Sequence, residues 1–302
     1  MDFGRLLTAI VTPFDEHGAL SLERTTALLE HLIETGSDGV VVAGTTGESP
    51  TLSDDEKLAL FKHVVNVSNG RLKVIVGTGT NNTHHSVEFS KEAAKLGVDA
   101  IMAVAPFYNK PNQEGIFEHY KAIAGSVDVP VVIYNIPGRS KVNIEAETII
   151  RLSKIKNIVA VKEASGNLDQ MAAIISGTDD RFHLYSGDDG LTLPIMSIGG
   201  QGVISVASHI IGPEMKQMIG HFLNGDHDAA ASEHRAMLPF MRALFAQPSP
   251  APVKAMLDSL GISVGGVRLP MVPLTAAEFN KLSAIYRKYE ETEGNAAGQT
   301  SK

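Results

Sequence analysis

A closed (β/α)8 barrel with a C-terminal helical extension is the fold class that the sequence predicts. The chain has 302 residues, a length that suits one α/β barrel with additions. Short apolar segments alternate with segments of helical periodicity eight times within about the first 225 residues. Several of the apolar segments run directly into short polar loops, which is where barrels of this class carry their chemistry.

Eight short segments are predicted as strands, each followed by a helix. Because a helix separates each strand from the next, the strands are expected to be parallel, and eight such units close a barrel. The predicted strands are Leu7–Val11, Gly39–Ala43, Lys73–Gly77, Asp99–Val104, Pro130–Tyr134, Ile158–Lys162, Phe182–Ser186 and Gly202–Ser205.

The intervening helices follow the spacing of apolar residues and the N-cap signals before them. Ser53 or Asp54 is expected to cap one helix, and Thr83 and Asn143 are expected to cap two others. The helices predicted in this way are Leu22–Glu34, Leu58–Val67, His84–Leu96 and Ile144–Leu152.

A doubly wound parallel sheet is the main alternative to the barrel. It is favoured by Gly77-Thr78-Gly79 after the third strand, but the third glycine of the dinucleotide-binding fingerprint is missing. We therefore interpret this segment as a tight turn between a strand and a helix.

Residues 1–225 are expected to form the barrel and residues 226–291 the helical extension. The extension is predicted to contain three helices, at Gly225–Ala246, Pro252–Leu260 and Thr275–Glu291. Residues 292–302 are rich in glycine, alanine and polar residues, so they are expected to be a disordered tail.

Composition and charge exclude several classes of function. Hydrophobic residues make up 43% of the chain, enough for a large core. A net charge of −8 without a run of Lys or Arg argues against a nucleic-acid or membrane partner, and we expect a soluble, cytoplasmic protein. The chain has no cysteine, so disulfides and thiolate sites are excluded. Its 11 histidines show no metal-binding spacing, and no metal is expected.

Lys162 stands out because it ends a buried strand and precedes a Ser-Gly-Asn turn. A buried ammonium is costly unless it is paired or neutral. Burial can lower the pKa of a lysine by several units and make the amine a nucleophile. The segment alone leaves open a second interpretation, in which Lys162 is a strand-end lysine paired with Glu163 or another carboxylate.

Other candidate residues follow the ends of neighbouring strands. Thr45 and Thr46 lie in a tight loop after the second strand, whose hydroxyls and backbone N–H groups suit a small carboxylate. Tyr134 ends the strand next to that of Lys162, and its phenol could transfer a proton to or from the amine. Arg139 offers a planar fork for a second carboxylate.

Three motifs together resemble the signatures of the dihydrodipicolinate synthase/N-acetylneuraminate lyase superfamily. They are Gly44-Thr45-Thr46-Gly47-Glu48, Tyr134-Asn135-x-Pro137 and Lys162-Glu163-Ala164-x-Gly166-Asn167. The resemblance covers nearly the whole chain, because it continues through Ser186-Gly187-Asp188-Asp189, Gly202-Val203-Ile204-Ser205, Pro252-Val253-Lys254 and Arg268-Leu269-Pro270.

The resemblance implies a Schiff-base enzyme of the class I aldolase type that acts on pyruvate through an imine on Lys162, without a cofactor. It is closest to the dihydrodipicolinate synthases of lysine and diaminopimelate biosynthesis, which condense pyruvate with L-aspartate 4-semialdehyde. By this resemblance Arg139 binds the carboxylate of the semialdehyde. Ser140-Lys141 departs from the commonest family pattern, Thr-Gly, so the geometry of this loop is an open point.

The resemblance also assigns roles to the remaining site residues. It implies a proton relay of Tyr134, Thr46 and Tyr108, with Tyr108 supplied by a neighbouring subunit of a homotetramer built as a dimer of dimers. Pyruvate would be held by Thr45, Thr46 and the backbone near Gly187 and Ile204.

Two other functions are weighed against the synthase. A lyase or aldolase for a sugar acid such as N-acetylneuraminate would share Lys162 and Tyr134 but would not need Arg139. A non-enzymatic regulator would not need any of these residues. Within the synthases, members inhibited by lysine resemble one another at a pocket where this chain has His85 and Phe107, so insensitivity to lysine is expected.

Overall fold

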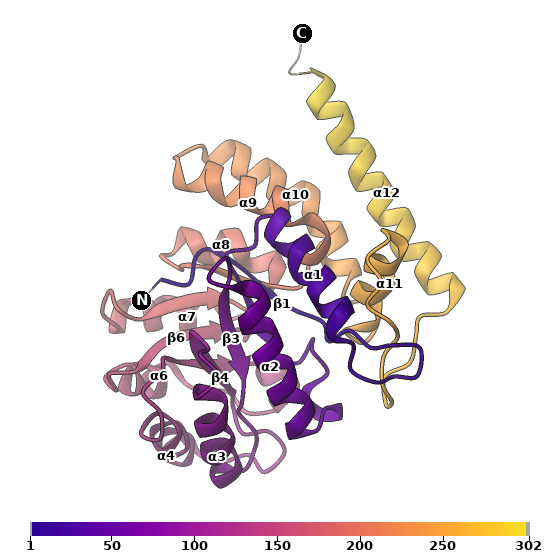
Figure 1. The fold of residues 1–302 in the computed structure, drawn as a ribbon. Coiled ribbons are helices and arrows are strands. Elements are labelled where there is room, and N and C mark those ends of the chain that lie inside the picture. The colour runs from indigo at the N-terminus through magenta and orange to yellow at the C-terminus, as the bar shows by residue number, and fades with distance from the viewer. Residues whose placement is uncertain (1, 300–302) are drawn as a thin grey trace.

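Eight parallel strands close a barrel in chain order in the computed structural model, which describes residues 2–299 (Figure 1). The predicted barrel is therefore confirmed, and the doubly wound alternative is wrong. The strands are β1 (Leu6–Ala9), β2 (Gly39–Val42), β3 (Lys73–Gly77), β4 (Ala100–Val104), β5 (Val131–Asn135), β6 (Ile158–Glu163), β7 (His183–Ser186) and β8 (Gly202–Ser205).

Helices follow the strands and surround the barrel (Figure 1). Two short 3-10 helices, η1 (Ser49–Thr51) and η2 (Asp189–Leu191), lie in the loops after β2 and β7. The α-helices of the barrel are α1 (Leu22–Glu34), α2 (Asp54–Ser68), α3 (Thr83–Ala94), α4 (Gln113–Ala124), α5 (Pro137–Ser140), α6 (Ala146–Leu152), α7 (Leu168–Gly177), α8 (Thr192–Ser197) and α9 (Ser208–Leu223).

Gly77, which ends β3, and Gly79 after it allow close packing between strands. A Cβ atom added at Gly77 would lie 2.4 Å from the carbonyl oxygen of Ala43, and one added at Gly79 would lie 2.5 Å from the Cα atom of Ala103. Any side chain at these positions would push the neighbouring strands apart. These contacts agree with a tight turn at Gly77-Thr78-Gly79.

The predicted N-caps are confirmed at one helix and wrong at two. Ser53 caps α2 in a capping box with Glu56. Helix α3 begins one residue earlier than predicted, so the capping side chain is that of Asn82 and not Thr83. The side chain of Asn143 binds Asn135 and a glutamine instead of a helix N-terminus, and α6 begins only at Ala146.

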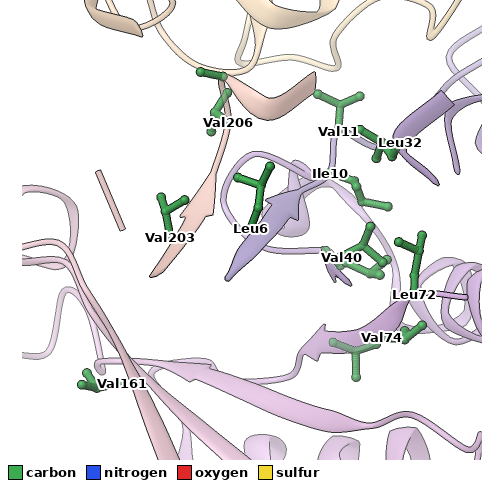
Figure 2. Packing of buried hydrophobic residues seen from close by; sticks show 14 of the residues in the cluster. Leu6, Ile10, Val11, Leu32, Val40, Leu72, Val74, Val161, Val203 and Val206 are labelled. Carbon is green, nitrogen blue, oxygen red and sulfur yellow. The ribbon is translucent and has the colours of Figure 1, made fainter. Parts of the chain in front are cut away.

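Strand residues alternate between two hydrophobic layers. Leu6, Val40, Val74, Val161 and Val203 belong to the cluster between the strands and the outer helices (Figure 2). Their chain neighbours face the barrel interior, where they form a second cluster with two tyrosines. Its strand members include Leu7, Val41, Ile75, Met102, Val132, Tyr134, Ala160, Tyr185 and Ile204.

Three further helices form the extension: α10 (His227–Ala243), α11 (Ala251–Ser259) and α12 (Ala276–Gln299). Helix α10 packs on α9 and α12, and the last part of α12 extends away from the barrel (Figure 1). Helix α12 continues to Gln299 instead of ending at Glu291 as predicted, because no proline interrupts it. Within the expected disordered tail, residues 300–302 lie outside the described residues. No helix within residues 2–299 is both long and apolar enough to cross a membrane.

Candidate active site

Lys162 lies inside the barrel near the carboxyl ends of the strands. It follows Ala160 by two residues on β6, so strand alternation directs its side chain to the same interior face. Its register partners are Tyr134 on β5 and Tyr185 on β7. The Nζ atom of Lys162 lies 4.5 Å from the centre of the Tyr134 ring, and the residue is only 5% exposed.

Burial lowers the pKa of Lys162 to about 8. The Asp189 carboxylate opposes this change and Arg139 adds to it, but both act more weakly than desolvation. At pH 7 roughly one amine in ten is therefore neutral, compared with about one in three thousand for a lysine in water. The lowered pKa makes the amine of Lys162, which lies among the apolar side chains of the barrel interior, a candidate nucleophile.

Glu163 is not the partner of Lys162. Its carboxylate lies on the opposite face of β6 and accepts hydrogen bonds from the side chains of Asn135 and Gln170 and from the backbone N–H of Ser165. Burial raises the pKa of this fully buried carboxyl. Pairing of Lys162 with Glu163 is therefore wrong, and Glu163 instead links β5, β6 and α7.

Asp189 is the carboxylate that raises the pKa of Lys162, against the larger effect of burial. Sequence reasoning missed this contribution. It is 2% exposed, and the backbone N–H groups of Val206 and Ala207 donate to it. Its neighbour Asp188 caps η2 by accepting a hydrogen bond from the backbone N–H of Gly190. Across residues 2–299 no group of three potential ligands is placed to hold a metal ion.

Tyr134 has a buried phenol that stays protonated at neutral pH. Burial raises its pKa to about 12, while a hydrogen bond with the side chain of Thr45 lowers it by a smaller amount. The threonine that contacts the phenol is thus Thr45, whereas sequence analysis gave the relay position to Thr46. Thr46 is 6% exposed in the same loop.

The mouth of the barrel holds two adjoining cavities, and Arg139 lines both. The first, of about 360 Å³, brings Arg139 together with Thr45 and Tyr134. The second, of about 370 Å³, is lined by Arg139, Ala164, Gly187, Asp188 and Arg242, and Gly187 lies against the Lys162 side chain. Among the described residues no acidic side chain forms an ion pair with Arg139, so its guanidinium is available to an anion.

The Ser140-Lys141 departure leaves Arg139 within a regular helical turn. Ser140 is buried, and its hydroxyl lies 2.9 Å from the carbonyl oxygens of both Ile136 and Val142. Lys141 takes the left-handed conformation, with φ of 61°, at the C-cap of α5. The loop therefore keeps the conformation that a glycine would favour, at some cost in backbone strain.

Gly187 lies against the side chain of Lys162, and Ile204 lies in the barrel interior. A Cβ atom at Gly187 would be 3.2 Å from both Cγ and Cε of Lys162, so glycine makes room for the lysine side chain. The Gly187 N–H already donates to the Glu163 carbonyl oxygen. Ile204 belongs to the interior cluster with Tyr134.

Tyr108, a predicted catalytic residue, lines neither cavity. It is 87% exposed and takes a left-handed conformation with φ of 71°, while its neighbour Phe107 lines the first cavity. Within one chain, a strained backbone and a solvent-exposed ring contribute little to the stability of the fold.

Comparisons with known proteins agree on one family. The profile of the dihydrodipicolinate synthetase family matches residues 2–289. The chain is 57% identical over 282 residues to 4-hydroxy-tetrahydrodipicolinate synthase 1 of Halalkalibacterium halodurans, covering 93% of this chain and 96% of that protein.

Solved structures give the same result. A dihydrodipicolinate synthase of Bacillus anthracis superposes with a TM-score of 0.94 at 51% identity, covering 95% of this chain and 98% of the other. The synthase of Cyanidioschyzon merolae, crystallised with lysine bound, superposes with a TM-score of 0.93 at 46% identity and the same coverage.

Proposed function

The chain belongs to the dihydrodipicolinate synthetase family, and we propose that it is a 4-hydroxy-tetrahydrodipicolinate synthase that condenses pyruvate with L-aspartate 4-semialdehyde. The observation that carries the chemistry is Lys162, a buried amine with a pKa of about 8 beside the protonated phenol of Tyr134. The proposal treats lysine and diaminopimelate biosynthesis as the setting of the reaction and needs no cofactor. A cytoplasmic location stays a prediction.

The first steps make pyruvate a nucleophile. The neutral Nζ of Lys162 attacks the keto carbon of pyruvate, and the resulting carbinolamine loses water to give a protonated imine. Loss of a proton from the methyl group then leaves an enamine. The Tyr134 phenol donates and recovers these protons, with Thr45 as its hydrogen-bond partner. Thr45, rather than Thr46, is thus our candidate for the relay, and Thr46 is our candidate for holding the pyruvate carboxylate.

The remaining steps join the two substrates. The enamine carbon attacks the aldehyde carbon of the semialdehyde, forming the new C–C bond. The amino group of the semialdehyde then replaces Lys162 at the imine carbon, which closes the ring and releases the lysine. Arg139 would hold the carboxylate of the second substrate, and the support is that it lines both cavities.

Arg139→Ala tests the choice between synthase and sugar-acid lyase. Losing one charge-assisted contact of about 1.5–3 kcal/mol should reduce turnover of the semialdehyde by roughly 10- to 150-fold. Imine formation with pyruvate should be largely unaffected, because that step does not use Arg139. Steady-state kinetics with each substrate, together with borohydride trapping of the pyruvate imine, measure the two effects separately.

Arg181→Ala is the matched control, because Arg181 is an exposed arginine that pairs with Asp179 before β7, at the other end of the barrel. It should leave both measurements unchanged. Efficient cleavage of N-acetylneuraminate by the wild type, without condensation of the semialdehyde, would show that the sugar-acid alternative is right.

We also propose a homo-oligomer, with a tetramer built as a dimer of dimers as in the family. The support is Tyr108, whose ring has no place in either cavity of its own chain although its loop lines the first. A neighbouring subunit would bring this phenol to the relay.

Control by lysine is expected to be weak in this chain. His85 is 2.8 Å from Asp54, and Lys57 lies 3.5 Å from the same carboxylate, so two basic groups already contact it. The first cavity reaches Lys57 and Phe107, and Phe107 offers no hydroxyl. Among the residues that the structure describes, the lining of this cavity therefore offers no carboxylate to the ammonium groups of lysine.

A titration of the condensation rate with lysine should give less than half inhibition at about 1 mM, since one missing charged contact weakens binding by an order of magnitude or more. The variant His85→Glu/Phe107→Tyr should bring half inhibition to a lower concentration. Half inhibition of the wild type well below the millimolar range would contradict the expectation.

A further inference from the structure

A buried ion pair joins the loop after β2 to the C-terminal extension. The Nζ atom of Lys254, on α11, lies 2.8 Å from Oε1 of Glu48, and the two side chains are only 3% and 2% exposed. Desolvation offsets most of the attraction in such a pair, so apolar side chains would stabilise the fold about as well. What the pair adds is a fixed geometry between two segments that are far apart in the sequence.

Both Lys254 and Glu48 make further contacts. The ammonium of Lys254 donates to the carbonyl oxygen of Gly266 at 2.6 Å and lies 4.2 Å from the centre of the Phe14 ring. The backbone N–H of Arg268 donates to the second carboxylate oxygen of Glu48 at 2.9 Å. Glu48 is therefore bound by the extension through both of its oxygens.

Arg268 extends this cluster of Glu48, Lys254 and Phe14 to the start of α2. Its guanidinium binds Glu56 and donates to the carbonyl oxygen of Thr51 at 2.8 Å. It also lies 4.3 Å from the Phe14 ring, which thus contacts both cations. The extension therefore contacts the end of the β2 loop at two places, through Lys254 at Glu48 and through Arg268 at Thr51.

The loop after β2, which the extension contacts, also carries the threonines of the candidate active site. Thr45 and Thr46 precede Glu48 by three and two residues, and the hydroxyl of Thr12 donates to the carbonyl oxygen of Gly47 at 2.6 Å. Glu48 has a left-handed backbone, with φ of 54°. A glutamate resists this conformation, so it persists only where surrounding contacts enforce it.

We infer that Lys254 is a positioning residue: through Glu48 it fixes the loop that presents Thr45 and Thr46 to pyruvate. The inference rests on the proposed function. It gives the helical extension a part in binding the first substrate, although none of the cluster's side chains needs to touch that substrate. Arg139 lies on α5, in a different loop, so the second substrate is held independently.

The test uses the double variant Glu48→Gln/Lys254→Met. The single variant Lys254→Met leaves a buried carboxylate without its partner and can unfold the protein. The double variant removes both charges at similar volume and should melt within a few degrees of the wild type. Because small displacements of binding groups have large effects, its KM for pyruvate should rise about 10- to 100-fold. Its KM for the semialdehyde should stay within about twofold, since the Arg139 loop is not disturbed.

Lys216→Met is the matched control. Lys216 forms a 3.0 Å ion pair with Asp38, which lies just before β2, at the opposite end of the same strand. Removing this second link between β2 and a later helix should leave both KM values unchanged.

A second readout does not need the condensation reaction. The pyruvate concentration that gives half-maximal borohydride trapping on Lys162 should rise in the double variant by the same factor as the KM. A wild type that traps pyruvate but does not condense it would refute the proposed function and leave this measurement intact. The inference is overturned if the folded double variant keeps its half-saturating pyruvate concentration, or if both KM values rise equally.

Discussion

Lys162→Ala should abolish condensation, with a loss of at least about 10³-fold, because the variant has no nucleophile to form the imine. In the wild type, pyruvate and borohydride should leave a stable adduct on Lys162, since reduction traps the imine. Mass spectrometry of the peptide containing Val161-Lys162-Glu163 measures the adduct. The variant should show no trapped adduct at any position.

Lys141→Ala provides the control for this experiment, because Lys141 is an exposed lysine near the site, beside Arg139. It should keep both the adduct on Lys162 and the activity. An unmodified Lys162 in a fully active wild type would refute the imine mechanism.

The pH dependence of trapping follows from the lowered pKa of Lys162. The protonated amine cannot attack a carbonyl, so the rate should rise with pH up to about 8 and level off above it. A lysine with an ordinary pKa would instead give a rate that keeps rising until about pH 10. The initial rate of adduct formation between pH 6 and about pH 10 distinguishes the two.

Tyr108→Phe should lower turnover by about 10²- to 10⁴-fold, the usual contribution of a positioned proton donor. If Tyr108 serves the site of a partner subunit, a mixed dimer of Tyr108→Phe and Lys162→Ala subunits contains one complete site. That site combines Lys162 of the first subunit with Tyr108 of the second. Differently tagged subunits, co-expressed and purified through both tags, should recover up to about half of the wild-type activity in such dimers.

The same experiment distinguishes a Tyr108 phenol that serves a partner subunit from one that acts within its own chain. In that case each subunit of the mixed dimer lacks one essential group, and no activity should return. A fully active wild-type monomer in sedimentation at the assay concentration would likewise contradict the shared site.

The fold was predictable because its signals are local and repeated. Each βα unit has its own apolar strand and helical period, and the bounds of β3 and β8 match the prediction residue for residue. Errors fell at helix ends such as those of α3 and α6. There, several polar side chains in a row could cap the helix, and tertiary contacts choose among them.

The candidate site was predictable in part for the same reason. Lys162 and Tyr134 end predicted strands and Arg139 follows one, and a parallel barrel brings all carboxyl strand ends to one rim. The sequence did not distinguish the roles of Thr45 and Thr46. Adjacent residues in a tight loop point in different directions, and only the folded loop shows that Thr45 contacts the phenol.

The sequence by itself determined the barrel, the lysine at the end of the sixth strand and the family to which the chain belongs. Only the tertiary structure decided the electrostatics of the site: the burial that lowers the pKa of Lys162, the Asp189 carboxylate that opposes it, and the pair of Glu48 with Lys254. The physical reason is one of range. Strand and helix patterns depend on neighbours along the chain, whereas desolvation and ion pairing depend on groups that folding brings together from distant segments.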